Sequence, residues 1–194
     1  NSALLQATLP GGAPAFSDPL LFNNIFWDNR AGTRSGGTVV GLGLPGDPNP
    51  IDTWDLGVAD AAGSVSPTNS ILQSQGHPGV FASTTNIVDV DPSVTSEFDL
   101  SVSFSPWRTN PNFIGALLVA VDAPAGQLGD YHISGTSPAV NAGAASKSGT
   151  SAPAWDIDND GRPNGAGYDI GADEIAGIPG PALASVAQGG GGAR

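Results

Sequence analysis

The acidic residues of this chain gather in one stretch near its C-terminal end, residues 156–174. Six of the chain's 18 acidic residues lie in these nineteen positions, with Arg162 as their only basic neighbour. Asp156, Asp158 and Asp160, followed by a glycine, have the alternate spacing with which calcium loops supply oxygen ligands. The stretch therefore predicts either a cation site or a group of carboxylates neutralised by arginine.

The calcium hypothesis needs ligands beyond the first three aspartates, because Ca²⁺ takes about six to eight oxygens. In an EF-hand-like loop the twelfth position carries a bidentate acid, but here that position is Gly167. Asp169 or Asp173 would have to substitute for it. The candidate metal ligands are therefore Asp156, Asp158, Asp160, Asp169 and Asp173, with Ca²⁺ as the expected ion.

The alternative hypothesis is structural. A guanidinium can form two parallel hydrogen bonds with one carboxylate, so Arg162 could pair with Asp169 or Glu174 and pin the end of the fold. Arg162 and Glu174 are accordingly the candidate residues of a structural cap. The two hypotheses are compatible with each other, and the sequence leaves both open.

Catalysis is a third alternative, with little in the sequence to support it. The chain has no cysteine, which excludes thiol nucleophiles. His77 and His132, the only histidines, lie 55 positions apart, so a metal site of three histidines is excluded, and no Gly-x-Ser-x-Gly motif occurs. His132 is interpreted as a satisfied histidine. No catalytic residue is predicted, and a non-enzymatic role is favoured.

Carbohydrate binding is the remaining chemistry to consider, because flat aromatic side chains stack on sugar faces. Of the four tryptophans, Trp107 lies beside Arg108 in a polar segment rich in turn-forming residues. Trp107 and Arg108 are therefore the candidate glycan contacts. Packing is the expected role of the other three tryptophans.

Charge and composition limit the possible partners. The formal net charge is −12, with 18 acidic against 6 basic residues, and such a surface repels phosphate backbones. Nucleic acid is therefore excluded as a partner. The sequence contains no run of about eighteen apolar residues, which excludes a membrane-spanning helix. A length of 194 residues fits one domain with a core of its own.

The elements that must position these residues are short strands. The chain has 28 glycines and 17 prolines, and the apolar runs between them are too short for helical periodicity. By β-branched and aromatic content the sequence predicts strands within 20–29, 37–44, 52–60, 69–75, 85–92, 113–122 and 130–135. An all-β chain is predicted, either a parallel β-helix or an antiparallel β-sandwich.

Asparagines near the first predicted strand favour the β-helix, since stacked coils align like side chains whose amides bond along the stack. Ordinary turn chemistry explains the same asparagines equally well. Hairpin signals are also few: the Asp-Gly and Asn-Gly pairs both lie inside the acidic stretch, at 160–161 and 164–165.

Several motifs resemble a known family. "NNIFWDN" at 23–29 looks like a coil of the right-handed parallel β-helix proteins of the pectate-lyase-like type. "DYHI" at 130–133, "SPAVNAG" at 137–143, "DGRP" at 160–163 and "DIGADE" at 169–174 resemble, in this order, the closing segment of bacterial surface β-helix proteins of the choice-of-anchor Q type. The match covers about 45 residues, and the usual spacer before Arg162 is missing.

The resemblance implies a right-handed parallel β-helix whose C-terminal segment is a lid. The chain then divides into β-helix coils (1–92), an inserted loop region (93–129), a closing coil with the acidic cap (130–176) and a Gly/Pro-rich tail (177–194). The implied function is a non-catalytic structural or interaction module, located outside the cell or on its surface and in contact with a neighbouring protein chain or with copies of itself. The alternative is a carbohydrate-binding or polysaccharide-cleaving module with a polysaccharide as partner.

Overall fold

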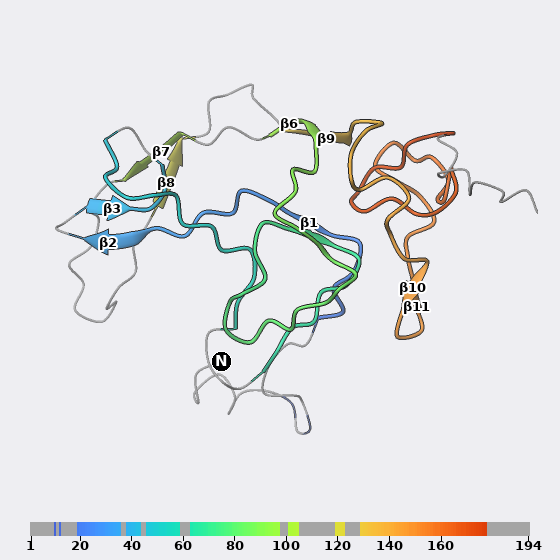
Figure 1. The fold of residues 1–194 in the computed structure, drawn as a ribbon, viewed down its shortest axis with the longest axis horizontal. Coiled ribbons are helices and arrows are strands. Elements are labelled where there is room, and N and C mark those ends of the chain that lie inside the picture. Colours follow the sequence, from blue (N-terminus) through green and yellow to red (C-terminus); the bar gives the residue numbers. More distant parts are fainter. Residues whose placement is uncertain are drawn as a thin grey trace, which may run out of the picture.

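The computed structural model describes residues 10, 12, 19–35, 38–43, 46–58, 63–97, 101–104, 119–122 and 129–177. These residues form short β-strands joined by turns, and they contain no helix (Figure 1). The prediction of an all-β chain is confirmed for this part of the sequence. Across the same residues, no helix has the length and apolar character needed to cross a membrane.

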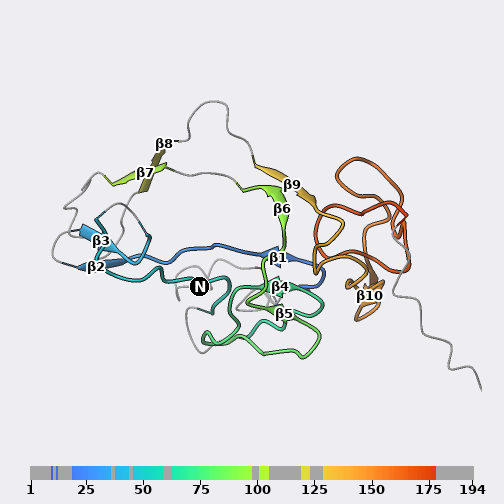
Figure 2. The ribbon, with the colours of Figure 1, turned by 45° about the horizontal axis from the view of Figure 1, so that its top comes forward.

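A three-stranded parallel sheet lies at the centre of the structure. It consists of β1 (Ile25–Phe26), β4 (Ile71–Leu72) and β5 (Ile87–Val88), in that spatial order. The three strands lie side by side (Figure 2). The register aligns Ile25 with Ile71 and Ile71 with Ile87, so three isoleucines occupy the same position in successive strands. Branched apolar side chains pack well on a pleated surface, which explains why these strands form here.

Polar side chains just before these strands link each strand to the next. The backbone N–H of Asn24 donates to Ser70 Oγ at 3.2 Å, and the N–H of Ser70 donates to Asn86 Oδ1 at 3.2 Å. One position earlier, the N–H of Asn69 donates to Thr85 Oγ1 at 3.1 Å. The three strands are thus held together by side chains as well as by the backbone ladder.

The other strands form four antiparallel pairs. One of them, at 146–151, turns through Ser148 and Gly149, whose φ angles of 48° and 83° are both positive, as a two-residue type I′ hairpin requires. The pairs are β2 (Thr33–Ser35) with β3 (Thr38–Val40), β6 (Val94–Ser96) with β9 (Asp130–Ile133), β7 (Ser101–Phe104) with β8 (Val119–Asp122), and β10 (Ser146–Lys147) with β11 (Thr150–Ser151).

One sequence-based expectation differs from this architecture. Segment 52–60 was predicted as a strand, but within its described part only Thr53 makes an isolated bridge, to Arg30. The Asp55 carboxylate accepts the N–H groups of Gln73 and Ser74 instead, at 2.6 and 3.2 Å. The inserted loop region, 93–129, contains β6, β7 and β8.

The core lies between the parallel sheet and the C-terminal part of the chain, residues 134–177, which we call the closing segment. Ile71, Ile133, Ala139 and Ile170 form its buried cluster, and each is at most 5% exposed. Partly buried apolar residues surround them from both sides, including Ile25. Burial of these side chains is what attaches the closing segment to the sheet.

The closing segment docks on the first strand of the sheet. The Asn23 side chain donates to Ala144 O at 2.8 Å and accepts the Ala144 N–H at 2.7 Å. The Gly171 N–H donates to Asn23 O at 3.1 Å. The opposite end of the sheet is β5, and no strand pairs with its outer edge within the described ranges. The closing segment therefore contacts the chain just before β1, and also just before β4, where Asn69 Nδ2 donates to Ala142 O at 3.2 Å.

Candidate functional site

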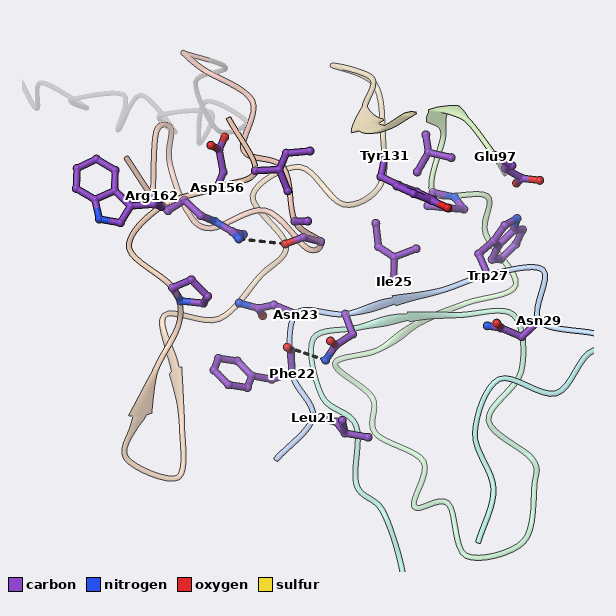
Figure 3. A pocket seen from close by; sticks show the side chains of 18 of the residues that line it. Leu21, Phe22, Asn23, Ile25, Trp27, Asn29, Glu97, Tyr131, Asp156 and Arg162 are labelled. Atoms are coloured by element: carbon purple, nitrogen blue, oxygen red, sulfur yellow. Dashed lines mark hydrogen bonds between the residues drawn. The ribbon is translucent and has the colours of Figure 1, made fainter. Parts of the chain in front are cut away.

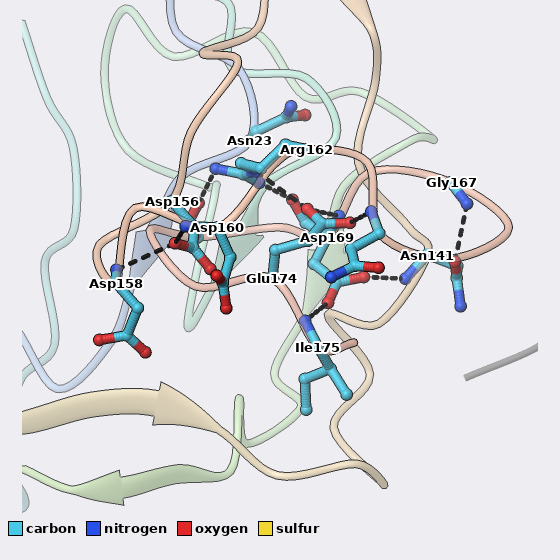
Figure 4. Close-up of polar contacts among 12 residues, drawn as sticks. Asn23, Asn141, Asp156, Asp158, Asp160, Arg162, Gly167, Asp169, Glu174 and Ile175 are labelled. Atoms are coloured by element: carbon cyan, nitrogen blue, oxygen red, sulfur yellow. Dashed lines mark hydrogen bonds and ion pairs between the residues drawn. The ribbon is translucent and has the colours of Figure 1, made fainter. Parts of the chain in front are cut away.

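The acidic loop, residues 156–160, is organised around the carboxylate of Asp156 (Figure 4). Asp156 Oδ1 accepts the backbone N–H of Asp158 at 2.9 Å and that of Asp160 at 2.7 Å. The Asp156 N–H donates in turn to Asp160 O at 3.0 Å. The alternate spacing of these aspartates thus produces a tight turn in which one side chain binds the backbone. Asp160 is exposed at the end of this turn.

Arg162 follows the loop in the chain and is buried against Glu174. Its Nε atom is 2.9 Å from Glu174 Oε2, and the two side chains are 3% and 1% exposed. The two terminal nitrogens donate to backbone carbonyl oxygens, those of Gly171 at 3.0 Å and Asp169 at 2.7 Å. The guanidinium therefore makes one bond to a carboxylate and two to the backbone, rather than two bonds to one carboxylate.

Among the acids in the described residues, Asp169 is the most deeply buried, at 1% exposed. Its two oxygens accept the N–H of Asn141 at 2.6 Å and that of Ile175 at 2.8 Å. Burial raises the pKa of the Asp169 carboxyl above its ordinary value, and the two N–H donors act in the opposite direction. Asp169 thus ties two parts of the closing segment together through the backbone.

Asp158 and Asp173 meet a histidine from outside the acidic stretch. His132 Nε2 is 2.8 Å from Asp158 Oδ2, and His132 Nδ1 contacts Asp130 Oδ1. Asp173 is 6% exposed, and its Oδ2 accepts the Ile133 N–H at 2.9 Å. The hydrogen bonds with Asp130 and Asp158 raise the pKa of His132 to about 9, and the bond with His132 lowers the pKa of Asp130.

The structure thus divides the five candidate metal ligands. Asp156 and Asp169 direct oxygens at backbone N–H groups, whereas Asp158 and Asp173 lie together with His132. Over the ranges that the structure describes, His132, Asp158 and Asp173 form the only gathered trio of acid or histidine side chains suited to holding a metal. A calcium site built from all five aspartates stays a prediction.

Sequence reasoning missed the place of His132 in this cluster. Its partners Asp158 and Asp173 lie 26 and 41 positions further along the chain. No local spacing connects residues so far apart. The one available signal was the pattern at 130–132, in which Asp130 and His132 point to the same side of a strand.

A groove of about 980 Å³ runs between residues 20–29 and the acidic loop (Figure 3). Aromatic side chains of Trp27, Tyr131 and Trp155 line it, and Tyr131 and Trp155 are 54% and 61% exposed. Asp28, Glu97 and Asp156 also line the groove. Flat aromatic surface next to hydrogen-bond acceptors is the composition of many carbohydrate sites.

The predicted glycan contacts, Trp107 and Arg108, lie outside the described residues, as does the tail after Gly177. Trp54 lies away from the groove, stacked on His77 with ring centroids 4.4 Å apart and an interplanar angle of 9°. Trp27 packs against the core cluster, as expected, and also borders the groove. Trp155, for which packing was expected, lines the groove and is 61% exposed.

Comparison of the chain with models of known protein families, with curated proteins and with solved structures found no match. The resemblance to surface β-helix proteins therefore has no support beyond the motifs themselves.

Proposed function

We propose that this chain is a non-catalytic structural and interaction module of an extracellular bacterial surface protein or filament. In this proposal the strands β1, β4 and β5 belong to successive coils of a right-handed parallel β-helix, and the closing segment is its acidic cap. The location outside the cell and the choice-of-anchor Q assignment rest on the motif resemblance alone.

The alignment of Ile25, Ile71 and Ile87 is the observation that carries the proposal. A coil cannot bury its apolar side by itself, so like residues repeated in register are the mark of a stacked repeat. The side-chain bonds from Asn24 to Ser70 and from Ser70 to Asn86 repeat the same register. A linear stack of this kind is suited to support and attachment.

The proposal assigns the two ends of the stack different roles. An uncovered strand edge pairs readily with other chains. Neither β1 nor β5 has a strand partner at its outer edge in the described part of the chain, but the closing segment contacts the backbone just before β1, through Asn23. We therefore assign the contact with a neighbouring chain or with another copy to the β5 end.

Gly171 provides the test of the cap. Its φ of +114° disfavours any side chain, and a Cβ atom there would lie 2.9 Å from Ile25 Cδ1. Because Ile25 Cδ1 is the end of a flexible side chain, the main effect of Gly171→Val is backbone strain, which should loosen the closing segment against β1. We expect the variant to self-associate in sedimentation velocity runs at increasing protein concentration, at a concentration where the unmodified chain keeps its size.

Gly177→Val is the matched control, since Gly177 also has a positive φ, +73°, but no atom lies within 4 Å of the added Cβ. This control should sediment like the unmodified chain. Circular dichroism of both variants establishes that strands are retained. A folded Gly171→Val variant that stays the same size at every concentration would contradict the capping role.

Carbohydrate binding is the second candidate function, favoured by the aromatic groove. The groove carries Asp28, Glu97 and Asp156, so an uncharged glycan suits it better than a polyuronate. The exposed Trp155 ring would stack on a sugar face, and its loss should weaken binding of a neutral oligosaccharide such as cellohexaose about tenfold. Isothermal titration calorimetry with Trp155→Ala measures this change.

Trp54→Ala is the control for this measurement, because Trp54 is also partly exposed, at 43%, but does not line the groove. It should leave the affinity unchanged. An equal loss of affinity in both variants would contradict binding of cellohexaose in the groove. The absence of binding heat with the unmodified chain would contradict it as well. Neither result bears on the cap, which the sedimentation experiment tests separately.

A further inference from the structure

Three side chains from separate parts of the chain converge beside β9. His132 comes from β9 itself, Asp158 from the acidic loop and Asp173 from the end of the closing segment. One ligand atom of each, a ring nitrogen and two carboxylate oxygens, lies within 4.8 Å of the other two. His132 Nε2 and Asp158 Oδ2 are already 2.8 Å apart.

This set of atoms suits a small divalent cation. Ligands bound at roughly 2.0–2.2 Å in a tetrahedral shell lie about 3.3–3.6 Å from one another. The ring nitrogen of His132 and the Asp158 oxygen, 2.8 Å apart, would have to separate by less than about 1 Å to reach that spacing. Asp158 can make this movement, because its side chain is 55% exposed on a surface loop. The fourth position would be taken by water.

The surroundings of His132 provide a second, independent argument. The histidine of a metal site characteristically donates its other ring N–H to a carboxylate or carbonyl oxygen, which fixes the ring and its tautomer. Asp130 Oδ1 contacts His132 Nδ1 in this manner, and Nε2 therefore faces Asp158. Asp173 is fixed as well, because its Oδ2 accepts the Ile133 N–H at 2.9 Å.

We propose that His132, Asp158 and Asp173 form a binding site for a divalent transition metal, with Zn²⁺ as the best match. Imidazole nitrogen and carboxylate oxygen are both zinc ligands, whereas Ca²⁺ prefers an all-oxygen shell of about six to eight ligands. A bound ion would join β9 to two parts of the closing segment, the acidic loop and the chain at Asp173. The site stands on these side chains and does not depend on the proposed surface role.

Cobalt titration of the metal-stripped full chain tests the site directly, because Co²⁺ replaces Zn²⁺ and its visible absorption reports the ligands. We expect bands more intense than those of the aqueous ion, lost again when Zn²⁺ is added. His132→Gln and Asp158→Asn should abolish these bands. Asp130→Asn, which changes only the orienting partner, should weaken Zn²⁺ binding about 10- to 100-fold.

Asp160→Asn is the matched control, because Asp160 is an exposed aspartate of the same loop outside the trio. It should bind Co²⁺ and Zn²⁺ like the unmodified chain. The proposal is overturned if the cobalt spectrum stays that of the aqueous ion, or if His132→Gln binds as tightly as the unmodified chain. A third result would also overturn it: Ca²⁺ at equal concentration displaces Co²⁺ from the unmodified chain but not from Asp160→Asn. The alternate aspartates of the loop would then be the metal ligands, with calcium as their ion.

Discussion

Replacement of Arg162 by alanine is expected to lower the free energy of unfolding by about 3–5 kcal/mol. The Arg162 and Glu174 side chains are 3% and 1% exposed, so the variant would leave the Glu174 carboxylate buried without its counter-charge. Carbonyl oxygens of Gly171 and Asp169 would lose their donors too. Urea unfolding followed by tryptophan fluorescence measures the change.

The chain contains a natural control for this experiment. Arg30 pairs with Asp28 at 2.7 Å, but these side chains are 37% and 32% exposed. Arg30 also donates from Nε to Asp28 Oδ1 at 2.8 Å and from Nη1 to Leu42 O at 2.9 Å, and these bonds are exposed. Because exposed ion pairs typically contribute about 0–1 kcal/mol, Arg30→Ala should cost clearly less than Arg162→Ala. If Arg162→Ala proved as mild as Arg30→Ala, the buried ion pair would not be what holds the closing segment.

Replacement of Ile71 by alanine should lower the free energy of unfolding by about 2–5 kcal/mol. Ile71 is 0% exposed and lies between Ile25 and Ile87 in the parallel sheet. The smaller side chain would leave a cavity at the point where the sheet meets the core, because neighbours on both sides are fixed by the strand register. The same urea unfolding experiment measures the loss.

Two further variants separate packing from other effects. Ile71→Val removes a single methylene and should cost about 0.5–1.5 kcal/mol. Ile51→Ala removes the same atoms as Ile71→Ala from a side chain that is 48% exposed, and should stay within about 0.5 kcal/mol of the unmodified chain. Equal losses for Ile51→Ala and Ile71→Ala would mean that the stacked isoleucines are not the centre of the core.

In the acidic stretch, the local spacing of residues left two kinds of loop possible. The alternate aspartates at 156–160 were interpreted as oxygen ligands of a calcium loop; in the structure, Asp156 binds two backbone N–H groups of its own loop. The calcium hypothesis assigned those oxygens to an ion. Local spacing describes a turn capped by its own side chain and a turn around a cation equally well, so it could not distinguish the two.

The sequence by itself determined the all-β character, because glycines and prolines leave only short β-branched runs between them. It also located the strand-forming stretches around Ile25, Ile71, Ile87 and His132, and it identified Arg162 as the one positive charge among the carboxylates. These are local properties, since each depends on residues that are neighbours in the chain.

Only the tertiary structure decided which distant residues meet. The pairing of β6 with β9 brings Ser96 opposite Asp130, and Asn23 meets Ala144 across 121 positions. Contacts of this kind also bring His132 to Asp158 and place the closing segment against the sheet. Composition and spacing carry no record of them, because long-range contacts are selected by the burial and hydrogen bonding of the whole chain.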